Sequence, residues 1–127
     1  MAKARKYRPI CDLIPYERAA VRSAVEKYKA AIMRNLDRGK PGDDGIDPVR
    51  VLPLDDICVV TDGNNRVKAF LECGLSDVPV IEEWKSPQDE KPYRAAAEEH
   101  KALRGFTKLP LVGDEGQRQS LPIPESK

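Results

Sequence analysis

The sequence contains few of the residues from which metal sites, disulfide frameworks and aromatic cores are built. Among its 127 residues are three cysteines, one histidine and one tryptophan, and aromatic residues make up only 6%. The cysteines are odd in number and show no C-x-x-C spacing, which argues against both a zinc site and a disulfide framework. We therefore expect reduced, buried thiols and no metal-binding cluster.

The chain also lacks a strong net charge and a long apolar run. It has 22 Lys and Arg against 21 Asp and Glu, a net charge of +1, whereas a sequence-independent nucleic-acid binder is usually more basic. No window is long and apolar enough to span a membrane, and no apolar core of a signal peptide follows the basic N-terminus. The sequence thus predicts a cytoplasmic, single-domain protein without a membrane partner.

The most informative stretch, DICVVTDGNNRVKAFLECGLSDVPVIEEW, lies at residues 56–84. Its β-branched run at residues 57–60 predicts a buried strand, and Thr-Asp-Gly at residues 61–63 predicts a turn. We expect Asn64 or Asn65 to cap the helix that follows. The apolar stripe of that helix is formed by Val67, Phe70 and Leu71.

The flanking segments give the order strand, long helix, hairpin strands, helix, strand, helix. Before the central helix, we predict a strand at residues 10–14, a helix at residues 16–37 that Pro15 starts, and a strand at residues 49–54. We predict that the central helix ends at Gly74. A strand at residues 78–81 follows, and then an Ala-rich helix at residues 93–104 that Gly105 closes. This order is typical of an α+β fold, a small mixed β-sheet covered by helices. Its expected core includes Val25, Ile32, Val59, Phe70 and Val80.

The remaining segments are richer in polar residues, glycine and proline. Residues 1–9 are a basic tail that either contacts nucleic acid or is solvated. Its cationic residues are Lys3, Arg5, Lys6 and Arg8. Residues 39–48 are predicted to form a long, mobile connector. The domain then spans residues 10–105, and residues 106–127 form a Pro-containing arm that drapes over the domain or a partner, or is disordered at its end.

Gly63 lies just before the central helix, where unpaired N–H groups and the helix dipole attract anions. Arg66, in the first turn, can grip a phosphate with two parallel hydrogen bonds. The stretch is therefore either a phosphate cradle or a strand–turn–helix whose arginine is merely solvated. Asp62 either serves a phosphate, as a Mg²⁺ ligand or a base, or stabilises the corner as an Asx turn. Asn64 and Asn65 can bind phosphate but cannot transfer protons near neutral pH.

The segment PVRVLPLDDICVVTDGNNRVKAFLECGLSDVPVI resembles the ParB/sulfiredoxin-like superfamily. The mark of that superfamily is a strand that ends in a Gly-x-x-Arg turn, followed by a helix, a glycine and a short strand of the V-P-V-I type. The upstream residues fit as well, with the short DLIP strand, a long helix and a Gly-rich gap before P-V-x-V. The resemblance covers residues 10–82 and implies a stand-alone, bacterial-type ParB-like domain.

Members of this superfamily carry different chemistry on that turn. In sulfiredoxins it reads Gly-Cys-His-Arg, and the cysteine attacks an ATP-activated sulfinate. Here Asn64 stands in its place, and an amide is no nucleophile. In free serine kinases the turn reads Asp-Gly-His-His-Arg. Here Asp62, Gly63 and Arg66 match that motif, while Asn64 and Asn65 replace both histidines.

Two further features of the superfamily bear on function. The kinases place a glutamate soon after the proline that opens the long helix, and Glu17 is similarly placed after Pro15, although the helix dipole alone also favours a carboxylate there. In ParB chromosome-partitioning proteins the Gly-x-x-Arg box helps to bind CTP phosphates, and a helix-turn-helix region follows. Only one plausible helix follows the core of this chain, so the resemblance does not extend to sequence-specific DNA binding.

From these residues we expect a nucleotide- or phosphate-binding ParB-like module without the sulfiredoxin reaction. Its ligand would be a nucleotide triphosphate or diphosphate with Mg²⁺. The binding residues would be Gly63, Asn64, Asn65 and Arg66. The alternative is an ATP- or ADP-dependent phosphotransferase or a ParB-like nuclease in which Asp62 and Glu17 are catalytic. A second alternative is a ligand-free structural or DNA-associated accessory protein, and the sequence leaves the nucleotide, a protein partner and the oligomeric state open.

Two single residues complete the sequence-based predictions. His100 is the only histidine, and we expect it to be exposed on the Ala-rich helix, far in sequence from the turn. Trp84 follows the last predicted strand, and we expect it to cover the core rather than to form a base-stacking platform.

Overall fold

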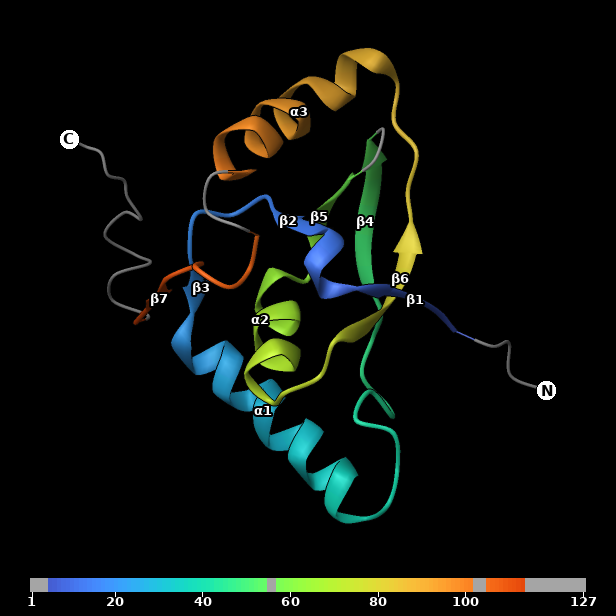
Figure 1. Cartoon of the computed structure of the whole chain (residues 1–127), viewed down its shortest axis with the longest axis vertical. Coiled ribbons are helices and arrows are strands. Elements are labelled where there is room, and N and C mark those ends of the chain that lie inside the picture. Colours follow the sequence, from blue (N-terminus) through green and yellow to red (C-terminus); the bar gives the residue numbers. More distant parts are fainter. Residues whose placement is uncertain (1–4, 55–56, 102–104, 114–127) are drawn as a thin grey trace.

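The computed structural model describes residues 5–54, 57–101 and 105–113 (Figure 1). Five strands form a mixed sheet in the order β1-β6-β4-β5-β2. They are β1 (Lys6–Pro9), β2 (Leu13–Pro15), β4 (Val49–Leu54), β5 (Ile57–Asp62) and β6 (Asp77–Glu82). A 3-10 turn, η1 (Ile10–Asp12), separates β1 from β2. Two short strands, β3 (Ala20–Val21) and β7 (Leu111–Val112), pair in parallel beside the sheet.

Three helices accompany the sheet: α1 (Arg22–Asp37), α2 (Asn64–Glu72) and α3 (Pro87–Lys101). Side chains alternate between the two faces of a strand, so Val51 and Val60 join one apolar cluster with α1 and α2. Leu52 and Val59 point the other way and pack with Ala97 of α3. The sheet therefore lies between α1 and α2 on one side and α3 on the other, which confirms the predicted α+β class.

The structure confirms the central part of the predicted element order. The strands β4 and β5 pair as an antiparallel hairpin, and β6 pairs in parallel with β4. Gly74 has the left-handed φ of 85° just after α2, as expected of a helix-ending glycine. All five predicted core residues are buried. The turn at residues 55–56 lies outside the described residues.

Two predictions for the N-terminal region are wrong. Lys6–Pro9, expected in a loose tail, forms β1 and pairs antiparallel with β6, and Lys6 and Arg8 both bind Glu82 across the strands. The strand expected at residues 10–14 starts only at Leu13, after the 3-10 turn. Lys6 and Arg8 thus belong to the edge strand of the sheet.

The long helix begins six residues later than predicted, at Arg22 rather than residue 16. Pro15 ends β2 instead of opening the helix. Residues 16–21, named the strap below, are not helical. Three of their backbone N–H groups bind partners remote in sequence: those of Tyr16 and Val21 bind side chains, and that of Ala20 binds the Pro110 carbonyl.

The C-terminal elements also differ from the predicted ones. Helix α3 begins at Pro87, where Ser86 Oγ accepts from the amide of Asp89 and proline suits the first helical position. Phe106 and Leu109, expected in the arm, are buried in the core. Their burial agrees with the alternative in which the arm lies against the domain. Residues 102–104 and 114–127 of the predicted helix and arm lie outside the described part.

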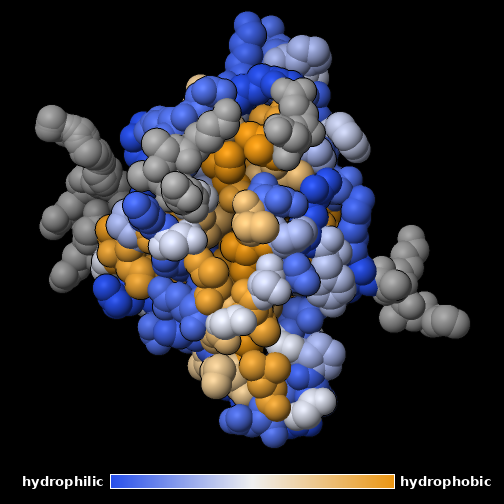
Figure 2. All heavy atoms as spheres, in the orientation of Figure 1, coloured by the Kyte–Doolittle hydropathy of each residue, from blue (hydrophilic) through white to orange (hydrophobic). Residues whose placement is uncertain are grey.

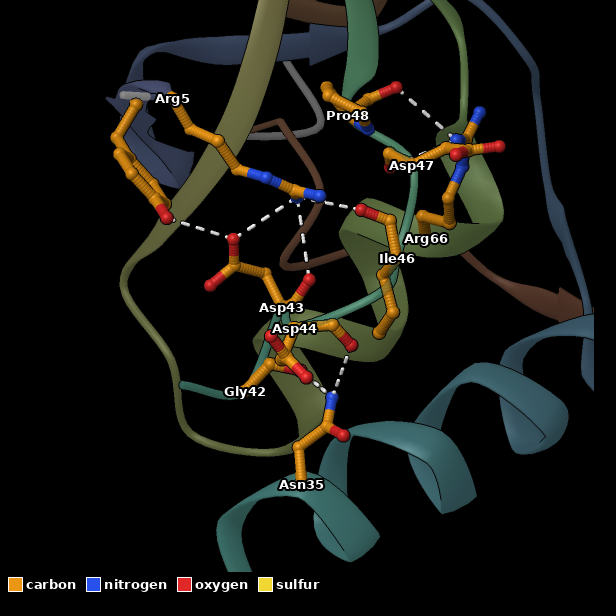
Figure 3. Close-up of polar contacts among 10 residues, drawn as sticks. Arg5, Asn35, Gly42, Asp43, Asp44, Ile46, Asp47, Pro48 and Arg66 are labelled. Carbon is orange, nitrogen blue, oxygen red and sulfur yellow. Dashed lines mark hydrogen bonds and ion pairs between the residues drawn. The ribbon is translucent and has the colours of Figure 1, made fainter. Parts of the chain in front are cut away.

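The connector at residues 39–48 is held by side chains from the end of α1 and from the N-terminal segment (Figure 3). Asn35 donates to the carbonyls of Gly42 and Asp44 at 2.8 Å each. Arg5 donates to the carbonyls of Asp43 and Ile46 and to the Asp43 carboxylate. The expectation of a mobile connector, which rested on composition, took no account of these donors.

One face of the molecule carries a stripe of apolar side chains (Figure 2). It contains a groove of about 850 Å³ between η1 and the C-terminal end of α2. Ile10, Leu13, Leu71 and Leu75 contribute to its lining. Among the described residues, no helix is long and apolar enough to cross a membrane.

Candidate functional site

A polar hollow of about 230 Å³ lies where β5 ends and α2 begins. Five of the predicted site residues line it: Glu17, Asp62, Gly63, Asn64 and Asn65. The strap brings Glu17 to this place from far along the chain, and the β5–α2 turn supplies the other four. Arg66 is the one predicted site residue that does not line the hollow.

Gly63 makes the whole turn from β5 into α2. Thr61 and Asp62, predicted to belong to the turn, continue β5 instead. Gly63 has a φ of 107°, and a Cβ there would lie 2.7 Å from Val49 Cγ1 and 2.9 Å from Arg66 Nη2. Because a side chain would meet both strain and collision, the tight corner requires glycine.

The first turn of α2 presents unpaired backbone donors beside this corner. The first bond within the helix runs from Val67 N to Gly63 O at 3.0 Å. Within the described residues, the amides of Asn64, Asn65 and Arg66 have no acceptor, and the first turn holds no acidic side chain. These amides and the positive end of the helix dipole favour an anion.

The two asparagines do not cap α2, which corrects the sequence-based expectation. Asn64 Oδ1 accepts from Tyr16 N at 3.2 Å, and Asn65 Oδ1 accepts from Val21 N at 2.8 Å. Asn64 Nδ2 also donates to the Val60 carbonyl. The pair therefore fastens both ends of the strap to the turn.

Arg66 is folded beneath the turn, and its side chain is only 11% exposed. Its Nη1 donates to the carbonyls of Asp47 and Pro48 at 3.0 and 3.2 Å (Figure 3). Its Nη2 lies 3.3 Å from Asp62 Oδ2, whose side chain is 66% exposed. The alternative interpretation, in which Arg66 is merely solvated, is thus excluded. A contact between Arg66 and phosphate stays a prediction.

Helix α3 contacts the strap and the preceding Pro15 on the side opposite the two asparagines. The sequence did not predict these contacts. His100 is 2% exposed rather than on the surface, and its Nδ1 lies 2.5 Å from the Pro15 carbonyl. Arg18 forms an ion pair with Glu99, and the rings of Tyr16 and Tyr93 lie 4.7 Å apart. The spacing of Tyr93, Ala97 and His100, three and four residues apart, is the signal that places this histidine on the buried face.

Other polar and aromatic predictions have mixed outcomes. Trp84 is 75% exposed, so it does not cover the core; it lies beyond Glu82, where β6 has ended. Cys58 is buried and Cys73 half-buried, and burial raises the pKa of both thiols above the ordinary value. Cys11, by contrast, is exposed. No group of three or more His, Cys, Asp or Glu among the described residues is arranged to hold a metal ion.

Comparison with known proteins places the fold. No family model and no curated protein matches the chain. Sulfiredoxin from Arabidopsis thaliana superposes with a TM-score of 0.54 at 14% identity, over 70% of this chain and 94% of that one. Protein Atu1540 from Agrobacterium tumefaciens gives a TM-score of 0.50 at 20% identity, over 80% of this chain and 49% of that one. The Pnob8-like ParB-N domain gives 0.43 at 16% identity, over 75% and 35% of the two chains.

The first two matches assign the chain to a structural class. It is an α+β protein with the sulfiredoxin-like fold, in which a curled mixed sheet is covered by three helices. This is the fold of the ParB/sulfiredoxin-like superfamily, which the sequence resembles. At these identities the likeness concerns the fold and leaves the chemistry of the turn to be argued from the chain's own residues.

Proposed function

We propose that the chain is a cytoplasmic ParB-like module that binds the phosphates of a nucleotide diphosphate or triphosphate in the hollow at the β5–α2 turn. The observation that carries this proposal is the set of open amides of Asn64, Asn65 and Arg66 beside Gly63. No side chain in the described part of the chain accepts from these amides, and phosphate oxygens are suitable acceptors for them. In addition, Asn65 Nδ2 has no partner among the described residues and can donate to the same ligand.

The two carboxylates of the hollow favour a nucleotide that carries Mg²⁺. Glu17 and Asp62 line the same space as the open amides, and they would repel a bare polyphosphate. Mg²⁺ is bound in proteins by one or two carboxylates together with substrate phosphates. These two residues would hold the ion, and the ion would neutralise charge on the phosphates.

A second candidate function rests on the same two carboxylates. An ATP- or ADP-dependent phosphotransferase or a nuclease would need a base in the hollow, and Glu17 and Asp62 are the groups available. The module ranks first because no histidine lines the hollow; the only one, His100, is bound to Pro15. Asparagine amides cannot move protons in its place.

The sharpest test is Asn65→Asp, because the two side chains have the same shape. The aspartate keeps the oxygen that accepts from Val21 N and places a negative charge among the open amides. We expect titration with Mg·ATP, Mg·ADP and Mg·CTP to show binding of at least one by the wild type. The variant should bind that nucleotide about ten- to a hundredfold more weakly. Its melting temperature should not fall, since an acid in the first turn favours the helix.

Gln88→Glu is the matched control. It adds the same charge at an exposed position in the first turn of α3, outside the hollow lining. It should therefore bind nucleotide as the wild type does. The proposal is wrong if no nucleotide binds the wild type, or if Asn65→Asp binds as tightly as Gln88→Glu.

A further inference from the structure

The strap carries Glu17 to the hollow and is held from two sides. On one side, Asn64 and Asn65 accept from the amides of Tyr16 and Val21. On the other side, three residues of α3 make contacts. Tyr93 packs against Tyr16, and Glu99 forms an ion pair with Arg18. His100 binds the carbonyl of Pro15, which directly precedes the strap. Glu17 therefore sits between two sets of contacts that approach the same short segment.

His100 differs from the other α3 residues at the strap because it is buried and binds the backbone. The ion pair of Arg18 and Glu99 is largely exposed, and exposed pairs contribute little to stability. His100, in contrast, is buried and donates from Nδ1 to the Pro15 carbonyl, because a carbonyl can only accept. That donation also fixes the tautomer of the ring when it is neutral.

The Pro15 carbonyl and the Tyr16 amide belong to the same peptide group. His100 Nδ1 binds its oxygen at 2.5 Å, and Asn64 Oδ1 binds its N–H at 3.2 Å. A planar peptide held at both ends cannot rotate without losing one bond. Glu17 is the residue after Tyr16. The held Pro15–Tyr16 peptide therefore sets the direction in which the strap leaves β2.

We propose that His100 is a positioning residue, which fixes the Pro15–Tyr16 peptide and thereby places the Glu17 carboxylate in the hollow. This inference rests on the proposed function for its consequence, the binding of a Mg²⁺-nucleotide. The claim that His100 fixes the Pro15–Tyr16 peptide depends only on the contacts described above. The sequence motif at residues 62–66 gives no hint of it, since the residue lies in a different helix.

The direct test is hydrogen exchange at the amides of Tyr16 and Val21, measured by NMR in the full chain without nucleotide. His100→Ala should speed exchange at both amides about tenfold, as expected for loss of a buried hydrogen bond. Exchange at Phe70 in α2 should not change. His100→Asn, which offers an amide N–H near the position of Nδ1, should restore most of the protection. Lys91→Ala, an exposed change on α3, should leave exchange as in the wild type.

Several results would overturn the inference. One is a folded His100→Ala protein with unchanged exchange in the strap, and another is His100→Asn exchanging as fast as His100→Ala. If His100→Ala does not fold, His100→Leu, which fills the buried position but offers no N–H to the Pro15 carbonyl, replaces it. That variant must speed exchange in the strap and not in α2, and unchanged exchange counts against the inference.

A nucleotide measurement separates this inference from the proposed function. If wild type binds Mg·ATP, His100→Ala and Glu17→Gln should each weaken binding, and the double variant should bind no more weakly than Glu17→Gln alone. Additive losses would mean that His100 does not act through Glu17. If wild type binds no nucleotide, the proposed function fails, while the exchange experiment still decides whether His100 fixes the strap.

Discussion

Arg66 donates hydrogen bonds to two backbone carbonyls that no sequence motif associates with it. In Arg66→Ala, the carbonyls of Asp47 and Pro48 lose their donor at a nearly buried position. We expect the free energy of unfolding, measured with urea, to fall by about 2–4 kcal/mol. Arg66→Lys should recover only part, since an ammonium lacks the planar fork of the guanidinium. A loss below about 0.5 kcal/mol would show that these hydrogen bonds contribute little.

Gly63 and Gly74 form a matched pair for separating backbone strain from collision. Both have positive φ, of 107° and 85°, but a Cβ at Gly74 would meet nothing within 4 Å. Gly74→Ala should therefore cost only the left-handed conformation, about 1–2 kcal/mol. Gly63→Ala should cost about 1–3 kcal/mol more, because its Cβ collides with Val49 and Arg66. Equal losses in thermal or urea unfolding would mean that the neighbours move aside freely.

At the scale of elements, β1 is fastened to β6 by charge. Glu82 Oε2 lies 2.8 Å from both Lys6 Nζ and Arg8 Nη2. Hydrogen bonds from Lys6 and then Arg8 hold the pKa of the Glu82 carboxyl below its ordinary value. The folded state therefore binds this proton less readily than the unfolded chain, whose carboxyl has a pKa of about 4.3.

The stabilisation by Glu82 is therefore complete above that pH and disappears as the pH falls through the lower native pKa. We expect Glu82→Gln to be less stable than wild type by up to about 1 kcal/mol at pH 7, since the pair is partly exposed. At about pH 2–3 the two proteins should unfold at nearly the same urea concentration. A difference that stays constant across this range would show that charge on Glu82 is not its cause.

Local pattern predicted the elements whose surroundings are simple. The apolar runs of β4, β5 and β6 reflect burial on both faces of the sheet, because a strand covered on both faces reads as a near-continuous apolar run rather than as an alternation. The strap is not the helix that its sequence predicts, because its conformation depends on Asn64, Asn65 and Pro110, which are remote in sequence. Helix propensity carries no information about such distant partners.

The candidate site was predictable only where its residues are adjacent or marked by resemblance. Asp62 to Asn65 are adjacent in sequence, from the end of β5 to the start of α2. Glu17 is marked by its place after a proline, as in the superfamily that the sequence resembles. The carbonyl partners of Arg66 and the grip of His100 on Pro15 arise from tertiary packing. No spacing rule connects residues that lie 85 positions apart, as His100 and Pro15 do.

At the scale of the whole molecule, N-terminal and C-terminal segments meet at the strap. The strap leaves β2, on which α3 packs, and its last two residues pair with β7. This arrangement leaves Glu17 and Asp62 in one hollow with the open amides of α2. The charges of these carboxylates then determine which form of a nucleotide is preferred.

This charge arrangement predicts opposite effects of the same variants with and without Mg²⁺. Glu17→Gln and Asp62→Asn should each weaken binding of Mg·ATP about tenfold, because a ligand of the ion is lost. In EDTA, where ATP is bare, each variant should bind ATP several-fold more tightly than wild type does, because a repelling charge is gone. Calorimetric titration of wild type and both variants under the two conditions provides the measurement. A phosphate-release assay on the Mg²⁺ samples shows whether the nucleotide is also consumed.

For a binding module we expect the sign of the effect to reverse between the two conditions, with no phosphate released above the rate without protein. Gln88→Glu again controls for overall charge, because it lies outside the hollow lining. Weaker binding in both conditions would mean that the two carboxylates act on the fold or bind the nucleotide directly rather than through the ion. Turnover by wild type that both variants abolish would instead identify Glu17 and Asp62 as catalytic, and the phosphotransferase or nuclease function would replace the module.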